Sequence, residues 1–246
     1  MIVQLDPNSL SFPDPRSALG PETDAPGLLA IGGDLRPERL LAAYRQGIFP
    51  WFGENQPILW WCLNPRMVLK TRDFKLHRSL RKTLQAFLHN PQCQLRVNAD
   101  PVGTLQDCAR APRAGQSGTW IVPAMQHAYT ELARRGVLQS VETWRGGQRI
   151  GGLYGLRIGR MFFGESMFSN APDASKLALS YLVALCRRDG IEWIDCQQAT
   201  AHLAHMGAAP VPLEAFLHHI HRATAAPELD PWAYDPSAWS QVMPTP

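Results

Sequence analysis

The 246-residue chain has few cysteines, little net charge and no long apolar run. Its five cysteines are odd in number and lack CxxC spacing, which argues against a disulfide framework and a zinc site. With a formal net charge of +3, any nucleic-acid contact must come from a local basic patch. No apolar run approaches the roughly 18 residues of a membrane span, and no basic-then-apolar signal opens the chain. We therefore expect a cytoplasmic protein whose thiols are reduced.

The composition is that of a globular protein with a domain boundary near residue 64. Apolar residues make up 45% of the chain and charged residues 18%, and this length allows one large or two modest domains. The Asn64-Pro65 step separates an aromatic-rich stretch from a basic one. We predict a small N-terminal domain over residues 1–64 and a larger domain over residues 65–246. The Pro-rich tail from Pro227 is expected to lie along the surface.

The middle of the chain predicts a three-stranded antiparallel meander. Its strands are expected at Leu138–Arg145, Arg149–Ile158 and Met161–Ser169, because turns with glycine separate three extended segments. A helical apolar pattern follows over Ala174–Arg188, and a further strand over Ile191–Gln197. A strand, a crossover helix and a second strand normally form a right-handed parallel unit. Together these elements predict an α+β fold with a mostly antiparallel sheet.

Two carboxylates stand where the strand pattern predicts burial. Residues two apart in a strand share a face, so Asp195 and Gln197 are expected to project together. Glu165 shares a face with its apolar neighbours unless Gly164 forms a bulge that redirects it. Because the two strands should lie side by side, Glu165, Asp195 and Gln197 are predicted to converge on one pocket. A buried carboxylate is costly, which favours a functional site. The alternative is that Asp195 only caps a helix or forms an ion pair.

Aromatic residues cluster between Gly47 and Trp61, where prolines interrupt them. Such a cluster forms either a small aromatic core under a loop or a platform on which a nucleobase stacks. A base stacked on an aromatic side chain gains roughly 1–3 kcal/mol. Trp51, held between a proline and a phenylalanine, is the leading candidate for a stacking platform.

Residues 64–82 carry seven Lys and Arg side chains against one acid, Asp73. A helix is predicted from about Lys75 to Leu88, with an apolar stripe inside and basic residues on the other faces. In a chain of nearly neutral charge this imbalance favours contact with phosphates, although a basic helix face is often simply solvated. The residues predicted to contact a nucleic-acid backbone are Arg66, Lys75, Arg78, Arg81 and Lys82.

The order of elements resembles the acyltransferase fold of the N-acetyltransferase superfamily. In that fold a glycine-containing turn at the start of the crossover helix holds the pyrophosphate of coenzyme A. The corresponding stretch here, residues 168–174, reads Phe-Ser-Asn-Ala-Pro-Asp-Ala, with no glycine and an added acid. Coenzyme A is therefore not the expected acyl donor.

Seven ordered segments are spread over almost the whole chain: Gly27–Leu35, Gly47–Phe52, Ile58–Trp61, Gly118–Ile121, Gly164–Ser169, Ala174–Lys176 and Ile194–Gln197. Together they resemble the leucyl/phenylalanyl-tRNA–protein transferase family. The resemblance implies an enzyme that moves Leu, Phe or Met from aminoacyl-tRNA to proteins with N-terminal Arg or Lys, marking them for degradation. It implies a small N-terminal domain, an acetyltransferase-like C-terminal domain, and no metal or nucleotide cofactor. We also expect a monomer.

The family's site residues map onto matching positions of this sequence. The resemblance implies that Trp51 and Trp120 bind the terminal adenosine of the tRNA. It implies that Glu165, Asp195 and Gln197 are the polar groups at the reacting centre. The pocket for the aminoacyl side chain maps to Leu153, Phe162, Gly164, Met167, Leu179 and Ile194.

An aminoacyl ester is already activated, so forming the amide chiefly requires alignment of the amine and the carbonyl. We expect Gln197 to orient the incoming α-amine and Asp195 to polarise Gln197 or to accept a proton. One alternative is a cysteine-nucleophile enzyme that uses Cys196 with His202 or His205. Strand alternation, which turns Cys196 away from Asp195, disfavours it. The other alternative is a non-catalytic RNA-binding module, which leaves the buried polar groups unexplained.

Overall fold

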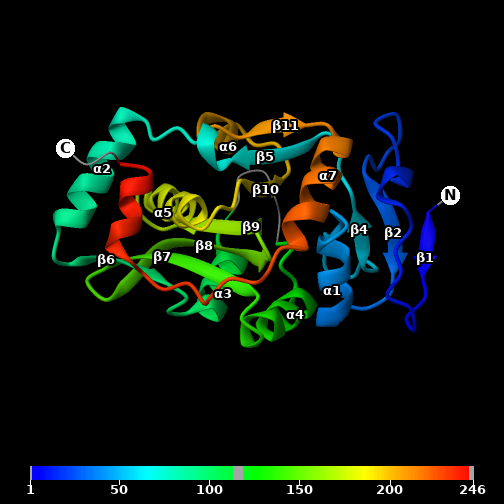
Figure 1. Cartoon of the computed structure of the whole chain (residues 1–246). Coiled ribbons are helices and arrows are strands. Elements are labelled where there is room, and N and C mark those ends of the chain that lie inside the picture. The colour runs from blue at the N-terminus through cyan, green and yellow to red at the C-terminus, as the bar shows by residue number, and fades with distance from the viewer. Residues whose placement is uncertain (1, 113–118, 244–246) are drawn as a thin grey trace.

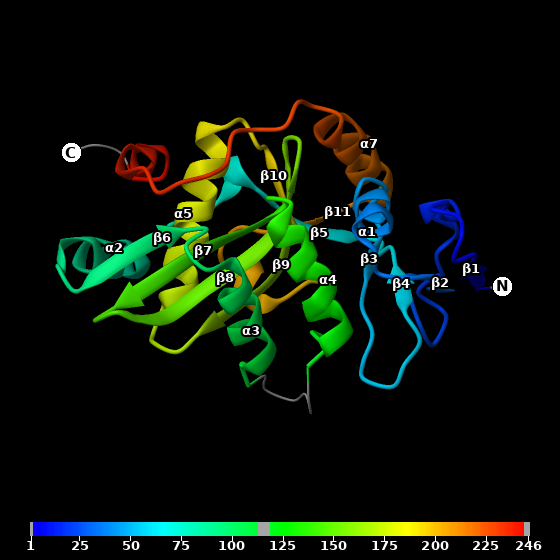
Figure 2. The ribbon, with the colours of Figure 1, turned by 90° about the horizontal axis from the view of Figure 1, so that it is seen from below.

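The computed structural model describes residues 2–112 and 119–243. Among these residues two β-sheets stand on either side of α1 (Pro37–Tyr44) and α7 (Leu213–Thr224), as Figures 1 and 2 show. The smaller sheet lies near the N-terminus and has the strand order β1-β2-β4-β3. Its strands are Val3–Leu5 (β1), Leu28–Gly32 (β2), Phe49–Pro50 (β3) and Leu59–Trp61 (β4).

The larger sheet has seven strands in the order β11-β5-β10-β9-β8-β7-β6. Neighbouring strands run antiparallel except β9 and β10, which run parallel. The predicted meander is therefore present as β7, β8 and β9, and the α+β class with a mostly antiparallel sheet is confirmed. The sequence pattern does not predict β5 or β6. The strands are Arg66–Lys70 (β5), Cys93–Val97 (β6), Leu138–Arg145 (β7), Gln148–Ile158 (β8), Met161–Ser169 (β9), Trp193–Gln197 (β10) and Ala209–Val211 (β11).

Helices cover both faces of the larger sheet. The predicted crossover helix, α5 (Ala174–Arg188), joins β9 to β10 and packs on one face, while α3 (Pro101–Arg110) and α4 (Pro123–Arg134) pack on the other. Successive side chains of β8 point to opposite faces of the sheet. Leu153 lies in the hydrophobic cluster that includes α5, and Tyr154 lies in the cluster that includes α3 and α4. None of the helices in residues 2–112 and 119–243 has the length and apolar content to cross a membrane.

The basic helix, α2 (Arg78–His89), starts three residues later than the predicted Lys75. The backbone N–H of Lys75 donates to the carbonyl oxygen of Met206, at 2.9 Å. Residues 75–76 therefore run alongside the segment that follows α6 (Ala201–His205), and His77 is the N-cap residue of α2. Of the four residues predicted on the apolar stripe, Leu80, Leu84 and Phe87 are buried in α2, whereas Leu76 precedes the helix and is only partly buried.

The strands β9 and β10 stay paired over only two residues. Phe162 pairs with Ile194 and Phe163 pairs with Asp195, and beyond these positions both strands are irregular. In β9 the register with β8 slips, so that Glu165 has no partner on β8 and forms the bulge that the sequence allows at Gly164. In β10 the register with β5 slips between Asp195 and Gln197. The two strands therefore diverge beyond Phe163 and Asp195.

The C-terminal tail, expected to lie along the surface, contributes to the core. The side chains of Trp232 and Trp239 are only 4% and 6% exposed. Tyr181, on α5, donates from its hydroxyl to the carbonyl oxygen of Asp235 at 2.9 Å and accepts from the backbone N–H of Asp235 at 2.8 Å. The tail covers the side of α5 that the sheet leaves open. Removing two large aromatic side chains from water in this way stabilises the folded protein.

Candidate active site

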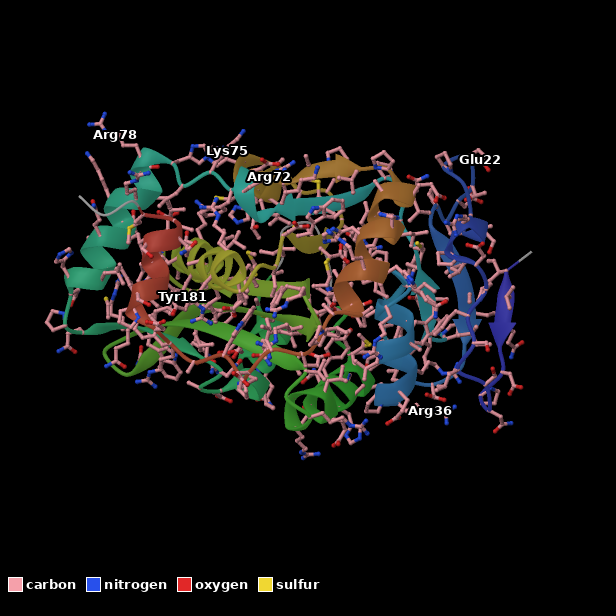
Figure 3. The ribbon with its side chains drawn as sticks, in the orientation of Figure 1. Glu22, Arg36, Arg72, Lys75, Arg78 and Tyr181 are labelled. Carbon is pink, nitrogen blue, oxygen red and sulfur yellow. The ribbon has the colours of Figure 1, made fainter. Side chains whose placement is uncertain are left out.

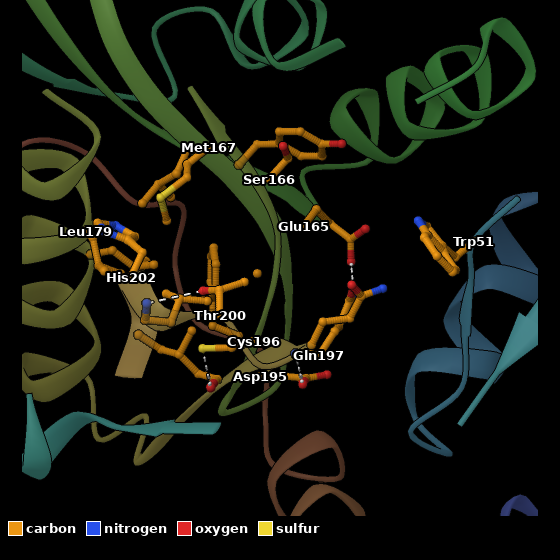
Figure 4. Close-up of a pocket in the computed structure, with 18 of the residues that line it drawn as sticks. Trp51, Glu165, Ser166, Met167, Leu179, Asp195, Cys196, Gln197, Thr200 and His202 are labelled. Atoms are coloured by element: carbon orange, nitrogen blue, oxygen red, sulfur yellow. Dashed lines mark hydrogen bonds between the residues drawn. The ribbon is translucent and has the colours of Figure 1, made fainter. Parts of the chain in front are cut away.

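A cavity of about 410 Å³ opens where β9 and β10 separate. Its walls come from β8, β9, β10, α5 and the segment around α6, and Trp51 approaches from the opposite side (Figure 4). The lining residues are Trp51, Trp120, Leu153, Tyr154, Phe162, Gly164, Glu165, Ser166, Met167, Leu179, Leu182, Ile194, Asp195, Cys196, Gln197, Gln198, Thr200, His202 and Leu203.

The six residues assigned to the aminoacyl pocket all line this cavity. Met167 and Leu179 lie together at the end away from Trp51 (Figure 4). A Cβ at Gly164 would lie 3.2 Å from the carbonyl oxygen of Asp195, so a side chain there would press against β10. These positions line one cavity, and an apolar lining is expected of a binding pocket for an apolar side chain. The six are Leu153, Phe162, Gly164, Met167, Leu179 and Ile194.

The tryptophans of the aromatic segment separate into core and cavity residues. Trp60 is fully buried, and its Nε1 donates to the carbonyl oxygen of Gly32 at 2.9 Å. Trp51 is partly exposed and borders the cavity, with its ring edge-to-face against Trp61 at 5.5 Å. The Nε1 of Trp61 also donates to the carbonyl oxygen of Trp51, at 2.6 Å. The aromatic-core interpretation therefore holds for Trp60, whereas Trp51 and Trp120 are placed to contact a ligand.

Glu165 is the centre of a polar cluster in the cavity. It accepts hydrogen bonds from the Tyr44 hydroxyl at 2.7 Å, the Tyr129 hydroxyl at 3.2 Å and the Gln197 Nε2 at 2.9 Å. The two tyrosine hydroxyls also bond to each other. Burial raises the pKa of Glu165 to about 7, although the hydrogen bonds from Tyr44 and Tyr129 act in the opposite direction. A carboxyl group with this pKa can exchange a proton at neutral pH.

Asp195 is among the residues that line the cavity, and Arg66 binds both oxygens of its carboxylate. Both side chains are fully buried, and the Arg66 Nε and Nη2 donate to Asp195 Oδ1 and Oδ2 at 2.8 and 2.7 Å. Burial acts to lower the pKa of Arg66, but the negative charge of Asp195 outweighs it, and the net shift is upward. The prediction that Arg66 contacts a nucleic-acid backbone is therefore wrong: a fully buried guanidinium cannot reach phosphates. Asp195 does form the ion pair that the alternative interpretation includes, and its role in the reaction stays a prediction.

The prediction that Asp195 and Gln197 share a strand face is also wrong. The slip in register pairs them with Val68 and Met67, which are adjacent in β5 and pack into opposite hydrophobic clusters. Gln197 has a φ of 57°, in the left-handed region that residues with a side chain rarely adopt. Its backbone N–H donates to Asp195 Oδ1 at 2.9 Å, and its side chain turns toward Glu165 (Figure 4). The two residues are thus coupled through the backbone.

The cysteine-nucleophile alternative is not supported. Cys196 and His202 both line the cavity, but burial raises the pKa of the Cys196 thiol to about 12. A thiol with this pKa stays protonated at neutral pH and is a poor nucleophile. His205 lies outside the cavity lining, where its ring stacks on His77 at 4.1 Å.

The basic segment splits into one buried residue and an exposed group. Whereas Arg66 is internal, Arg72, Lys75 and Arg78 project outward along one edge of the molecule in Figure 3. The exposed group predicted to contact a nucleic-acid backbone consists of Lys75, Arg78, Arg81 and Lys82, none of which lines the cavity.

Two functional candidates, Tyr44 and Tyr129, are not predicted as site residues from sequence. The helical pattern places both in the core, which is correct, since both are buried. Their hydroxyls nevertheless meet at Glu165, although 85 residues separate them in the chain. No local spacing signals such a meeting. Within the described residues, no group of three His, Cys, Asp or Glu side chains is arranged to hold a metal ion.

Comparison with known proteins agrees with this architecture. The family model described as leucyl/phenylalanyl-tRNA protein transferase matches residues 68–221, and the model of that family's N-terminal domain matches residues 33–64. The chain belongs to the leucyl/phenylalanyl-tRNA–protein transferase family. Family membership confirms the class of enzyme that the sequence predicts.

Relatives within the leucyl/phenylalanyl-tRNA–protein transferase family match nearly end to end. The proteins of that name from Leptothrix cholodnii and Ralstonia pickettii are each 52% identical over 237 residues, covering 96% of this chain and 93% and 95% of their own. The Cupriavidus taiwanensis protein is 49% identical over all 246 residues and 98% of its own length.

A distant structural match is also found. A GCN5-related N-acetyltransferase from Kribbella flavida aligns over 71% of this chain and 60% of its own, with 10% identity and a TM-score of 0.35. A likeness this low carries no argument. The acetyltransferase-like order rests on the meander, α5 and the parallel strand β10 themselves.

Proposed function

We propose that the enzyme transfers Leu, Phe or Met from aminoacyl-tRNA to the α-amine of proteins that begin with Arg or Lys, and that this marks them for degradation. The observation that carries the proposal is one cavity that joins an apolar end, two tryptophans and a hydrogen-bonded polar cluster. The 3′ end of an aminoacyl-tRNA has matching parts: an apolar side chain, a nucleobase and a reactive ester between them. The proposed setting is the cytoplasm, where aminoacyl-tRNA and protein N-termini occur together.

The apolar end of the cavity suits an unbranched or γ-branched donor side chain. Phe162 and Ile194 supply an apolar wall on which a charged side chain would be buried without a partner. Leu, Met and Phe are expected to compete closely, because one methylene is worth only about 1–3 kcal/mol. The terminal adenosine of the donor stacks on Trp51 and Trp120, which gains roughly 1–3 kcal/mol per base.

The reaction needs alignment more than activation. The acceptor's α-nitrogen attacks the ester carbonyl carbon, the new C–N bond forms, and the bond from that carbon to the ribose oxygen breaks. The proton lost by the amine ends on the departing ribose oxygen. The amine must be neutral and about 3 Å from the carbonyl carbon. Gln197 orients it through the side-chain amide, which Glu165 holds in place.

Asp195 supports Gln197 and does not take the proton itself. Its two oxygens already accept from Arg66, and Oδ1 also accepts from the Gln197 backbone. Glu165 is the better group for proton exchange, since burial raises its pKa to about 7. Among the described residues no Lys or Arg pairs with Glu165, so a cationic group of the acceptor can supply the missing positive charge.

The remaining parts of the enzyme have proposed roles as well. Residues 1–64 act as a small N-terminal domain that supplies Trp51, and residues 65–246 act as the catalytic domain. Lys75, Arg78, Arg81 and Lys82 contact phosphates of the tRNA, since they are exposed basic side chains in a segment with one acid. The enzyme works as a monomer.

Transfer of labelled Leu from leucyl-tRNA to a peptide that begins with Arg tests the proposal. We expect labelled peptide, and none from the same peptide with an acetylated N-terminus, because acetylation removes the nucleophile. A peptide beginning with Asp controls for the choice of acceptor. Binding of leucyl-tRNA without any labelled peptide would favour the RNA-binding module. Transfer that Cys196→Ala abolishes would favour the cysteine nucleophile.

A further inference from the structure

Arg66, on β5, is a fully buried arginine between the small sheet and the cavity. Its guanidinium lies between the rings of Phe49 and Phe216, with its central carbon 4.7 Å from each ring centroid. Phe49 comes from β3 and Phe216 from α7, so Arg66 contacts both the N-terminal and the C-terminal parts of the chain. A cation between two aromatic rings is held by electrostatic attraction as well as by packing.

The hydrogen bonds of Arg66 connect it to two parts of the chain, in two directions: toward Asp195 and toward Gly47. Nε and Nη2 form a two-pronged contact with the carboxylate of Asp195, and Nη1 donates to the carbonyl oxygen of Gly47 at 3.1 Å. The planar fork of a guanidinium fixes the relative positions of everything that it bonds. Lysine, with one nitrogen on a flexible stem, cannot reproduce this arrangement.

The first direction leads to Gln197. Asp195 Oδ1, bonded to Arg66, also accepts from the Gln197 backbone N–H at 2.9 Å. A φ of 57° is unfavourable for a residue with a side chain, so the surrounding contacts must hold Gln197 in this conformation. The bond to Asp195 does so, and it aims the Gln197 side chain at Glu165.

The second direction leads to Trp51. Gly47 stands four residues before Trp51, and a Cβ at Gly47 would come within 3.0 Å of the Phe216 ring. The chain is therefore held against α7 at this point, and Arg66 bonds to the carbonyl of the same residue. From there β3 carries the chain to Trp51, which lies across the cavity from Gln197 in Figure 4.

We propose that Arg66 is a positioning residue that sets the separation between Trp51, which stacks the donor's adenosine, and Gln197, which orients the acceptor's amine. Both roles belong to the proposed function, on which this inference rests. Arg66 acts on the reaction rate through Asp195 and on donor binding through Gly47. A buried ion pair adds little net stability over well-packed apolar groups, so the geometry that it fixes explains its place.

The substitution Arg66→Lys keeps the charge and removes the fork. We expect weaker binding of leucyl-3′-aminoadenosine, an amide-linked and therefore unreactive mimic of the donor's terminus. We also expect slower single-turnover transfer from saturating leucyl-tRNA to a peptide that begins with Arg. Each should change by roughly tenfold or more, because a misplacement of about 1 Å can cost 100-fold in rate. Asp195→Asn disturbs only the hydrogen bonds that connect Arg66 to Gln197. It should therefore slow transfer and leave the Kd of the mimic unchanged.

Arg39→Lys is the matched control. Arg39 is also fully buried and donates to the backbone carbonyls of Asp6 and Pro7, but it does not line the cavity. It should lower the melting temperature without changing the Kd or the rate. Folded Arg66→Lys with wild-type Kd and rate would overturn the inference.

A further outcome separates this inference from the proposed function. If Arg66→Lys does not fold, Asp195→Asn decides: an unchanged rate, or a Kd that changes with the rate, would overturn the positioning role. Wild-type protein that binds the mimic but transfers no Leu would overturn the proposed function. The effect of Arg66→Lys on the Kd would still test its link to Trp51.

Discussion

Replacing Glu165 by Gln should make the protein more stable at neutral and alkaline pH. Burial among Tyr44, Tyr129 and Gln197 raises the pKa of Glu165 from 4.5 to about 7. Between these values the folded protein binds more protons at this group than the unfolded chain does. The free energy of unfolding therefore falls as the pH rises from about 4.5 to about 7 and is level above it. Gln does not ionise, so the free energy of unfolding of the variant does not fall in this way as the pH rises.

The size of the effect follows from the shift and from the hydrogen bonds that change. Each pH unit is worth about 1.4 kcal/mol, so a shift from 4.5 to about 7 corresponds to about 3 kcal/mol. Gln keeps one carbonyl oxygen for Tyr44 but presents an NH₂ group where Tyr129 needs an acceptor, at a cost of about 1 kcal/mol at every pH. Glu165→Gln should thus be slightly less stable than wild type at pH 4 and about 2 kcal/mol more stable at pH 8.

Urea unfolding followed by tryptophan fluorescence, at several pH values from 4 to 8, measures this difference. Glu54→Gln, on an exposed loop side chain, is the control for the substitution itself and should follow the wild type at each pH. If wild type and Glu165→Gln differ by the same amount at pH 4 and pH 8, burial does not destabilise the Glu165 carboxylate and the reasoning is refuted. The stabilised variant should transfer Leu more slowly, because it has lost the group that exchanges a proton.

Three further variants test donor binding and the cysteine-nucleophile alternative. The combined change of Arg78, Arg81 and Lys82 to Ala should weaken tRNA binding and flatten its salt dependence, with transfer from leucyl-adenosine unchanged; equal losses with both donors would contradict phosphate contact. Leu153→Trp fills the apolar end of the cavity and should slow Phe transfer more than Leu transfer, measured by competition; equal slowing would show that Leu153 does not border the side chain. Cys196→Ala should leave single-turnover transfer close to wild type, and its abolition would restore the cysteine route.

The elements around the cavity could be predicted because their signals are local. The meander, α5 and β10 each carry a period or a turn that a short window of sequence displays. The strand β5 could not, because only Met67, Val68 and Leu69 stand between two charged residues in a basic run. A three-residue apolar stretch is compatible with a strand, a helix or a loop.

The errors at the site have a different cause: they depend on contacts between distant parts of the chain. Arg66 looks like one more surface cation until β5 is seen beside β10, where Asp195, 129 residues later, meets it. The register shift between Asp195 and Gln197 adds one residue to β10, and the apolar pattern gives no sign of it. Because of this residue, Asp195 and Gln197 lie on opposite faces and not on the shared face that was expected. The six pocket residues, by contrast, were mapped from the family resemblance, and all six line the cavity.

The C-terminal tail supports a wall of the cavity through Trp232. Trp232 stacks on Phe162 at 5.9 Å, its Nε1 donates to Asp189 at 2.6 Å, and the guanidinium of Arg157 lies 4.9 Å from the centre of its ring. Phe162 lines the cavity, so Trp232 supports that wall from behind. The shape of the donor pocket should therefore depend on a segment that is distant from Phe162 in the sequence and has no described residue in the cavity lining.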